Sequence, residues 1–488
     1  MKIDDLLVIG GGINGAGIAA DAAGRGLSVT LCEQNDLASG TSSASTKLIH
    51  GGLRYLEQGE FGLVHEALNE REVLMAKAPH LISPLSFVIP YQKQLRPRWL
   101  IQLGLWIYDH LGQRVTLPKS RRLRFKDTPY GAPLKPSLTD GFIYSDCWVD
   151  DARLVLANAL AAQALGARIF TYTEVTNTVA MNGIWHVTVY DKMAKQLHTL
   201  YAKALVKATG PWMDDPDFKL ELVKGSHIIV RETYPGTHAY LIQHTDNRVI
   251  FVIPYEHDYT LIGTTDLLYH GTPNHVEIDA VEKNYLIDAY NQYFQKSLSV
   301  GDIVADYSGI RPLVDSGKEN PSETSREYTL AVKEVNHAAL LAVFGGKITT
   351  YRTLAEHAMD ALAPFFPNMK PAWTKNAPLP GGNIRDFNAF MTTMADRYPF
   401  LSRDEITRLA HLYGTQMEQL LEGVRTKTDL GEYFGAGCYE RELKYAIQHE
   451  WVKKPEDFLY RRTKLYLSLT PDERRRVEQW FHDHPNAI

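Results

Sequence analysis

A short apolar run near the start of the chain passes directly into a glycine-rich turn. Leu6–Ile9 has the continuous hydrophobic pattern of a buried parallel strand, and residues 10–15 read Gly-Gly-Gly-Ile-Asn-Gly. Small and apolar residues follow with helical spacing as far as Gly24–Gly26, and Leu27–Leu31 has the pattern of a second strand. The sequence therefore predicts a β-α-β unit whose first strand and helix are joined by glycines.

Two later segments repeat this order of apolar strand and glycine. Ala204–Ala208 leads into Thr209-Gly210, and Leu340–Phe344 leads into Gly345-Gly346 and a helix predicted over Thr350–Leu362. The first could return to the sheet of the opening unit, and the second provides another helix N-terminus, which favours a partial negative charge. A strand turn uses glycine in many folds, so neither segment alone identifies a ligand.

The last part of the chain becomes helical after a linker rich in proline and glycine, Lys375–Asn383. Ser402 and Glu405 have the spacing of a capping box, and Thr470 followed by Pro471 predicts another helix start. No side chains with evident chemistry gather in this region, which is predicted to be a helical cap or an oligomer contact.

Residues 93–111 form an amphipathic segment of a different kind. Lys93, Arg96 and Arg98 stand at its start, and tryptophans and aliphatic residues follow. This profile is typical of a helix that lies in a membrane interface, and the segment is too short to cross a bilayer. A buried core helix with a basic cap has the same periodicity, so both interpretations stay open.

Composition limits the classes of function. The 488 residues are enough for several domains, and 52 basic against 57 acidic residues give a net charge of −5, without the basic surplus typical of nucleic-acid-binding proteins. Cys32, Cys147 and Cys438 form no disulfide or metal-binding pattern, and no metal site is predicted. Neither a signal peptide nor a membrane-spanning run is recognisable, so we expect a cytoplasmic protein, soluble or attached to a membrane surface.

The glycines of the opening unit predict a bound dinucleotide. Gly10, Gly12 and Gly15 allow a tight turn and a close approach of the backbone to a pyrophosphate, whose charge the helix N-terminus stabilises. Glu33 follows the second strand, where a carboxylate accepts hydrogen bonds from ribose hydroxyls and repels a 2′-phosphate. This spacing does not distinguish FAD from NAD, and a structural unit with nothing bound is the alternative.

Longer motifs carry a resemblance to a known family. They are the block 41–55, which reads TSSASTKLIHGGLRY, and the segments 10–17, 144–153, 224–227, 263–266, 308–312, 344–347, 429–432 and 449–451. On these motifs the chain resembles the aerobic, respiratory FAD-dependent glycerol-3-phosphate dehydrogenases over nearly its whole length. The resemblance implies FAD as cofactor and oxidation of sn-glycerol 3-phosphate to dihydroxyacetone phosphate, by hydride transfer from C2 to flavin N5. It also implies a quinone as electron acceptor and a homodimer attached peripherally to the inner face of the cytoplasmic membrane.

The same resemblance assigns residues to the cofactor. Beside the three glycines and Glu33, these residues are Ile13, Asn14, Thr41, Ser42, Ser43, Ser45, Lys47, Thr209, Gly210, Gly346, Lys347, Thr349 and Thr350.

For the substrate, the resemblance implies a phosphate clamp. Arginine suits this role because its planar fork binds phosphate oxygens in pairs. The candidates are Arg54, with Tyr55 beside it, Arg311 and Arg326. Arg326 precedes Glu327, so an ordinary surface ion pair is the alternative there.

A proton acceptor for the substrate hydroxyl is also required. His50 and His227 are the titratable groups nearest physiological pH within the matched motifs, and a structural role is the alternative for each. Lys347 could polarise the substrate oxygen, stabilise the reduced flavin or act as the base, and the sequence does not choose among these roles.

The predicted fold is α/β, with a Rossmann-type FAD-binding domain, an interwoven substrate domain with a mixed sheet and a C-terminal helical cap domain. From the resemblance, the FAD-binding domain is discontinuous and takes residues 1–80, 142–225 and 340–370. The substrate domain takes residues 81–141 and 226–339, including the candidate membrane-contact segment 93–111. The cap takes residues 384–488.

Three other functions fit parts of the sequence. An oxidase acting on the same substrate would pass electrons to oxygen and release peroxide, and a non-catalytic protein would bind flavin without turnover. An amino-acid oxidase of the same superfamily would need an arginine for a carboxylate but no group of several cations.

Overall fold

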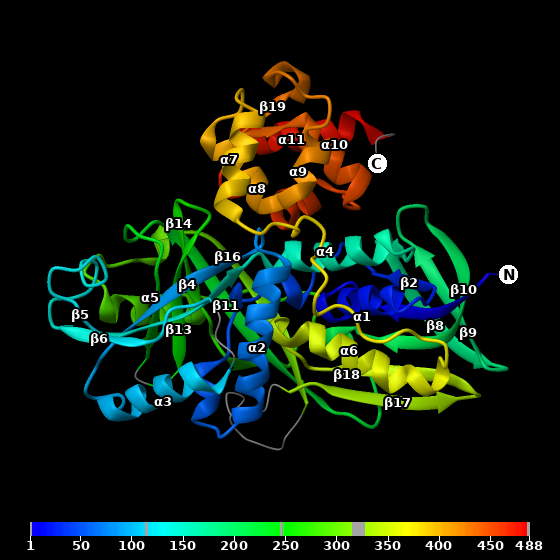
Figure 1. Cartoon of the computed structure of the whole chain (residues 1–488), viewed down its shortest axis with the longest axis horizontal. Helices are drawn as coiled ribbons and strands as arrows, with labels where there is room; N and C mark the ends of the chain where they lie inside the picture. Colours follow the sequence, from blue (N-terminus) through cyan, green and yellow to red (C-terminus); the bar gives the residue numbers. More distant parts are fainter. Residues whose placement is uncertain (1, 113–115, 245, 247, 315–326, 486–488) are drawn as a thin grey trace.

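Two large β-sheets meet at the centre of the molecule, and helices from the C-terminal part of the chain sit on top of them (Figure 1). The structure is a computed structural model, and it describes residues 2–112, 116–244, 246, 248–314 and 327–485. The alternation of strands and helices in both halves of the body confirms the predicted α/β class.

The first sheet is built around the opening strand. β1 (Ile3–Ile9) lies between β2 (Val29–Cys32) and β10 (Gln196–Lys207), and both run parallel to it. The sheet is completed by β7 (Arg168–Phe170), β8 (Thr173–Met181), β9 (Ile184–Asp191), β17 (Thr329–Val335) and β18 (Ala338–Phe344). The predicted strand near 204–208 therefore does return to the sheet of the opening unit, and the strand near 340–344 pairs beside it in the same sheet.

Both faces of this sheet are covered. Leu6 and Val8 point to the face where α1 (Ile13–Gly24) packs between α4 (Asp151–Ala164) and α6 (Tyr351–Leu362). Leu7 points to the other face, which the β8–β9 hairpin covers. Each fully buried aliphatic side chain stabilises the fold by about 1.5–3 kcal/mol, which explains the unbroken apolar run in β1.

The second sheet has ten strands and is mixed. Its members are β3 (Leu48–Ile49), β4 (Ile82–Pro90), β5 (Arg121–Arg124), β6 (Asp140–Val149), β11 (Leu220–Arg231), β12 (Ala239–Gln243), β13 (Val249–Tyr255), β14 (Tyr259–Gly263), β15 (Leu267–Leu268) and β16 (Ile303–Val314). α5 (Ala280–Tyr293) packs on one face, and α2 (Phe61–Lys77) and α3 (Arg98–Leu111) pack on the other. No helix in the described part of the chain is both long enough and apolar enough to cross a bilayer.

The strand pairings divide the chain differently from the predicted boundaries. β6, which the prediction assigned largely to the FAD-binding domain, and β11, which it divided between the two domains, both pair within the second sheet. β17 lies wholly before residue 340, in the predicted substrate domain, but pairs with β18 in the first sheet. For β6 and β11 the physical reason is that a largely buried strand has the same apolar pattern in either sheet.

The C-terminal part forms a separate helical domain above the sheets (Figure 1). Its elements are α7 (Phe387–Arg397), α8 (Arg403–Tyr413), α9 (Met417–Leu420), β19 (Tyr433–Gly435), β20 (Cys438–Tyr439), α10 (Glu440–His449) and α11 (Pro471–Asp483). The helix starts predicted at Ser402 and Thr470 are confirmed, because each residue caps its helix in a complete capping box. We call this unit the cap domain.

Candidate active site

A cavity of about 690 Å³ is lined by residues of both sheets. Its wall includes Ile9 and Ala208 at the carboxyl ends of parallel strands of the first sheet, and Phe251 and Arg311 on strands of the second. Its volume lies within the range of about 300–1,000 Å³ typical of ligand pockets, and ligands of open α/β sheets bind at this end of the strands.

The N-terminus of α1 faces the cavity because three glycines bring it there. Gly10 has a φ of +111°, and a Cβ on it would lie 2.4 Å from the carbonyl oxygen of Ala208. A Cβ on Gly15 would lie 2.0 Å from the carbonyl oxygen of Gly10, so strand and helix pack closely only without these side chains. A Cβ on Gly12 would approach only Ser42 Oγ, at 3.1 Å, among the described atoms. Gly12 therefore keeps the space before the helix N-terminus open for an anion.

Glu33 is fixed at the end of β2 by backbone groups. Its carboxylate accepts hydrogen bonds from the N–H of Gly11 at 2.6 Å and of Asn35 at 2.8 Å. Burial raises the pKa of the Glu33 carboxyl group above its ordinary value, and these two hydrogen bonds oppose the rise. The adjoining loop also contacts the helix, because the N–H of Ile13 donates to Ser42 Oγ at 2.9 Å.

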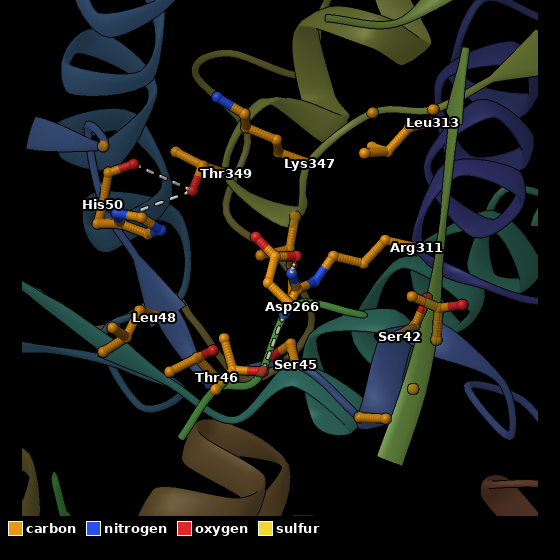
Figure 2. Close-up of a pocket in the computed structure, with 18 of the residues that line it drawn as sticks. Ser42, Ser45, Thr46, Leu48, His50, Asp266, Arg311, Leu313, Lys347 and Thr349 are labelled. Carbon is orange, nitrogen blue, oxygen red and sulfur yellow. Dashed lines mark hydrogen bonds and ion pairs between the residues drawn. The ribbon is translucent and has the colours of Figure 1, made fainter. Parts of the chain in front are cut away.

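A second group of predicted residues lies where β3 meets the short helix η6 (Ile348–Thr350). The N–H of His50 donates to Thr349 Oγ1 at 3.3 Å, and the His50 ring packs edge-on against Phe251. Lys347 Nζ lies 3.7 Å from the centre of the Tyr55 ring. Figure 2 shows His50, Thr349 and Lys347 around the same space.

Two arginines of the cavity share one carboxylate. Arg311 donates to Asp266 Oδ1 at 2.8 Å (Figure 2) and to Thr264 Oγ1 at 2.9 Å. Arg54 Nη2 lies 4.0 Å from Asp266 Oδ2. Lys347 belongs to the lining of the same cavity. A partly enclosed wall with arginine forks is suited to a phosphate group.

Most of the predicted site residues line this one cavity. They are Gly10, Gly12, Ile13, Asn14, Glu33, Thr41, Ser42, Ser45, His50, Arg54, Tyr55, Thr209, Gly210, Arg311, Gly346, Lys347 and Thr349. The predicted residues Gly15, Ser43, Lys47, Thr350 and His227 do not line it. Arg326 lies outside the described residues.

Lys47 and His227 are held by contacts outside the lining of this cavity. Lys47 Nζ is buried and lies 2.9 Å from Asp151. His227 is buried behind the wall, with Nε2 3.0 Å from Thr46 Oγ1 and its ring stacked on Tyr307. Burial, together with the positive charge of nearby groups, lowers the pKa of His227 well below its ordinary value.

Asp266, Thr264 and Phe251 line the cavity and contact predicted residues, but they were not among the predicted site residues. Asp266 and Thr264 hold Arg311, and Phe251 packs against His50. The quoted motif 263–266 contains two of them, and a carboxylate within a motif of a cation-rich site is a signal that could have identified Asp266. Phe251 lies in an ordinary apolar strand, so no sequence signal distinguishes it.

Two family models match the chain. Residues 5–352 match the model described as FAD dependent oxidoreductase, and residues 372–479 match the C-terminal domain of alpha-glycerophosphate oxidase. The chain belongs to the FAD-dependent oxidoreductase family. The second match covers most of the cap domain.

Relatives of this oxidoreductase extend over almost its full length. It is 49% identical to the aerobic glycerol-3-phosphate dehydrogenase of Escherichia coli K12 and 49% identical to the D-erythritol 1-phosphate dehydrogenase of Brucella abortus, in each case over 99% of this chain and 98% of the relative. The solved structure of the glycerol-3-phosphate dehydrogenase from Bacillus halodurans complexed with FAD covers 100% of this chain and 95% of that chain, with a TM-score of 0.77 and 29% identity. The family resemblance predicted from the motifs is confirmed.

FAD is the cofactor of this oxidoreductase, and the cavity fits it. Gly12 leaves room beside a helix N-terminus that no acidic side chain occupies in its first turn. Asn14 Oδ1 is buried and has no hydrogen-bond partner among the described residues, although Asn14 Nδ2 donates to the carbonyl of Gly345. A buried acceptor without a donor is costly, so a ligand that supplies one suits this position.

Proposed function

We propose that this oxidoreductase converts sn-glycerol 3-phosphate to dihydroxyacetone phosphate, with hydride transfer from C2 of the substrate to flavin N5. The observation that carries the proposal is the cluster of Arg54, Asp266 and Arg311 in the same cavity as His50 and Lys347. The cavity then contains arginine guanidinium groups, a histidine that could accept a proton and the N-terminus of a helix.

The glycine end of the cavity would hold the cofactor. The N-terminus of α1 would bind the pyrophosphate, and Glu33 would accept hydrogen bonds from the adenosine ribose. Gly346, Lys347 and Thr349, at the start of the second helix, would lie at the flavin, which accepts the hydride when bound.

Arg54 and Arg311 would bind the substrate phosphate, with Tyr55 at the edge of the clamp. Asp266 holds both guanidinium groups within one small region, so their forks are preorganised for a dianion. The predicted contribution of Arg326 stays a prediction.

His50 is the proposed proton acceptor for the substrate hydroxyl, because it lines the cavity while His227 lies behind Thr46. We expect His50→Asn to lower kcat by about 10²–10⁴-fold. His227→Asn should have a smaller effect on kcat. The reverse order of the two losses would contradict the assignment.

Anaerobic bleaching of the flavin absorbance tests the proposal. We expect sn-glycerol 3-phosphate to bleach the flavin, while glycerol with inorganic phosphate leaves it oxidised. Bleaching by amino acids alone would indicate an amino-acid oxidase, and a flavin that no substrate bleaches would indicate a non-catalytic flavoprotein. Either result contradicts the proposal.

D-erythritol 1-phosphate is the second candidate substrate, because a relative named for it is as similar as the glycerol-3-phosphate dehydrogenases. Both substrates are phosphorylated alcohols, so the proposed arginine clamp serves either. Comparing kcat/KM for the two compounds measures the preference of the enzyme. A higher kcat/KM for D-erythritol 1-phosphate would make it, rather than sn-glycerol 3-phosphate, the proposed substrate.

A membrane quinone is the proposed electron acceptor, and α3 supports this part of the proposal. Leu100 and Leu103 of α3 line the cavity, while Trp99 and Trp106 are 65% and 60% exposed. These exposed fractions favour an interfacial helix over the buried core helix. The enzyme would then lie peripherally on the inner face of the cytoplasmic membrane; a homodimer stays a prediction.

Vesicle sedimentation tests the role of α3. The double substitution Trp99→Ser and Trp106→Ser should release the protein from vesicles of anionic lipid, while Leu197→Ser, at an equally exposed site on β10, should not. Unchanged sedimentation of the double variant would refute this assignment. Rapid peroxide release with slow reduction of a quinone analogue would instead identify an oxidase.

A further inference from the structure

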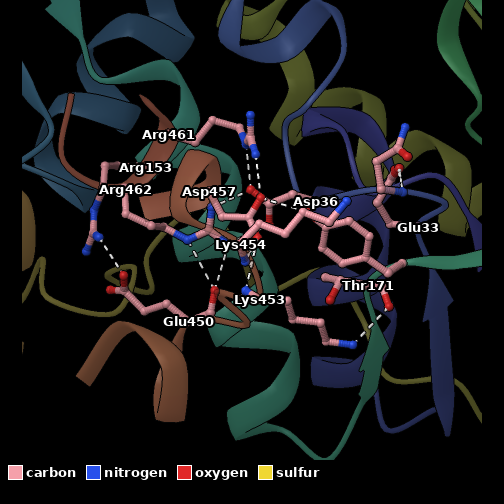
Figure 3. Close-up of polar contacts among 12 residues, drawn as sticks. Glu33, Asp36, Arg153, Thr171, Glu450, Lys453, Lys454, Asp457, Arg461 and Arg462 are labelled. Carbon is pink, nitrogen blue, oxygen red and sulfur yellow. Dashed lines mark hydrogen bonds and ion pairs between the residues drawn. The ribbon is translucent and has the colours of Figure 1, made fainter. Parts of the chain in front are cut away.

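The cap domain contacts the loop that follows Glu33 through a buried ion pair. Arg462, at the end of the π-helical segment η10 (Asp457–Arg462), donates to both carboxylate oxygens of Asp36 at 2.7 Å. Arg461 donates to the same carboxylate at 2.5 Å (Figure 3). The side chains of Arg462 and Asp36 are 2% and 1% exposed.

Arg462 is itself held rigidly within the cap domain. Its guanidinium group also donates to the carbonyl of Glu450 at 2.7 Å, and the carboxylate of Glu450 accepts from Arg153 of α4 at 2.9 Å. Burial alone would raise the pKa of Asp36, but Arg462 and Arg461 outweigh it and hold the pKa below its ordinary value. The carboxylate is therefore a fixed, charged anchor point.

A second connection joins η10 to the same loop. Tyr172 Oη donates to Asp457 at 2.7 Å, and the backbone N–H of Tyr172 donates to the carbonyl of Asn35 at 2.8 Å. The next residue, Thr173, donates its N–H to the carbonyl of Glu33 at 2.8 Å. One cap element is thus linked to the backbone on both sides of position 34.

The loop needs such anchors because it separates two cavities. Gln34, Asn35 and the segment 39–41 line the cavity assigned to FAD and also a second cavity of about 650 Å³. Tyr460 and Arg461 of the cap domain belong to the wall of this second cavity. Leu37 and Ala38 of the loop are buried in the hydrophobic core, but residues 34–35 and 39–41 have open space on both sides. In these stretches side-chain packing contributes little, so polar contacts determine the position of the backbone.

We propose that the cap domain is a working part of the cofactor site, with Arg462 acting through Asp36 as a positioning residue for FAD. Arg462 keeps the loop 33–42 in place, and this loop carries Glu33 at the ribose and Ser42 beside the α1 N-terminus. The inference rests on the proposed ribose contact of Glu33 but not on the identity of the substrate.

The rate of FAD release from the purified holoenzyme tests the inference. The gain of free-flavin fluorescence after dilution would be followed for Arg462→Gln, for Asp36→Asn and for the double variant. We expect each single variant to release FAD at least tenfold faster than the unaltered protein. The double variant should release it no faster than the quicker single variant, because the two residues act as a pair.

Arg408→Gln is the matched control. Arg408 forms a comparable paired contact with Glu442 inside the cap domain, at 2.9 and 2.7 Å, and does not touch the loop. The Arg408→Gln variant should have a lower unfolding temperature, but below that temperature it should release FAD at the same rate as the unaltered protein. Equal release rates for Arg462→Gln and Arg408→Gln would overturn the inference.

Glu33→Gln separates this failure from a failure of the proposed ribose contact. If Glu33→Gln accelerates FAD release and Arg462→Gln does not, the ribose contact stands and the positioning role of the cap domain is wrong. If Glu33→Gln retains FAD like the unaltered protein, the ribose contact itself is wrong and the inference fails with it.

Discussion

At the residue scale, Arg311 reaches the cavity because position 225 has no side chain. Gly225 lies on β11, which pairs with the strand β16 that carries Arg311. A Cβ on Gly225 would lie 2.2 Å from Arg311 Nη2 and 2.7 Å from Thr264 Oγ1. The glycine therefore provides the space in which the guanidinium group meets Asp266.

Gly225→Ala should weaken the proposed phosphate clamp without altering the cofactor end. Hydrogen bonds to charged groups contribute about 1.5–3 kcal/mol, so we expect KM for sn-glycerol 3-phosphate to rise by about ten- to a hundredfold. Steady-state kinetics measure this change. Gly62→Ala is the control, because a Cβ on Gly62 has no described atom within 4 Å. An unchanged KM in Gly225→Ala would argue against Arg311 as a phosphate ligand.

A motif shows which segment lies at the cavity but not where each of its side chains points. Several residues of the motif 41–55 line the cavity, but Lys47 within it contacts Asp151, which is remote in the sequence. His227 likewise ends behind Thr46 because strand pairing determines which face it occupies. Such directions depend on tertiary pairing, which a motif does not encode.

At the element scale, the glycines of α1 divide into two kinds. Gly15 permits the packing of strand against helix, whereas Gly12 has φ and ψ of −81° and −176°, which any residue adopts, and faces the cavity. Within one glycine motif, Gly15 is therefore needed for folding, whereas Gly12 is needed for ligand binding.

Gly12→Ala and Gly15→Ala should separate these requirements. We expect the Gly12 variant to fold with a near-normal unfolding temperature as apoprotein but to lose FAD, because its Cβ occupies the space before the helix N-terminus. The Gly15 variant should be destabilised even without FAD, since its Cβ would collide with backbone. Thermal unfolding and visible flavin absorbance measure the two effects. Normal FAD content in the Gly12 variant would contradict the proposed pyrophosphate position.

Elements with a local signature were predictable, and those without one were not. The β1–α1–β2 unit and the capped starts of α8 and α11 are encoded by residues close in sequence. The assignment of β6 to the second sheet depends on its pairing with β4. Both strands are largely buried, so apolar periodicity gives no information about the choice of sheet.

At the scale of the whole molecule, the cap domain rests on the body through groups that are distant in sequence. Asp36 and Arg462 are 426 positions apart, and no local pattern predicts that they meet. The sequence predicted a helical cap or an oligomer contact, without any contribution to the cofactor site. Contacts between domains depend on how folded surfaces fit, so the role of the cap becomes visible only in the assembled structure.

His80 lies at this junction and must stay neutral when the molecule is folded. It is 2% exposed, its carbonyl accepts from His411 Nδ1 at 3.2 Å, and a Cβ on Gly381 would lie 2.7 Å from its Nε2. Burial, with smaller contributions from Arg153 and His411, lowers the pKa of His80 to about 3. The unfolded chain, with an ordinary histidine pKa of about 6.5, binds one more proton than the folded chain between these values.

The free energy of unfolding should therefore fall as the pH decreases below about 6.5, by about 1.4 kcal/mol per pH unit for this one histidine. Urea unfolding between about pH 7 and pH 4 measures the slope. His80→Gln cannot bind this proton, so its slope should be shallower by that amount even if its stability at neutral pH is lower. His482→Gln, at a site 82% exposed, should keep the slope of the unaltered protein. Parallel slopes for the unaltered protein and His80→Gln would mean that the junction does not require a neutral His80.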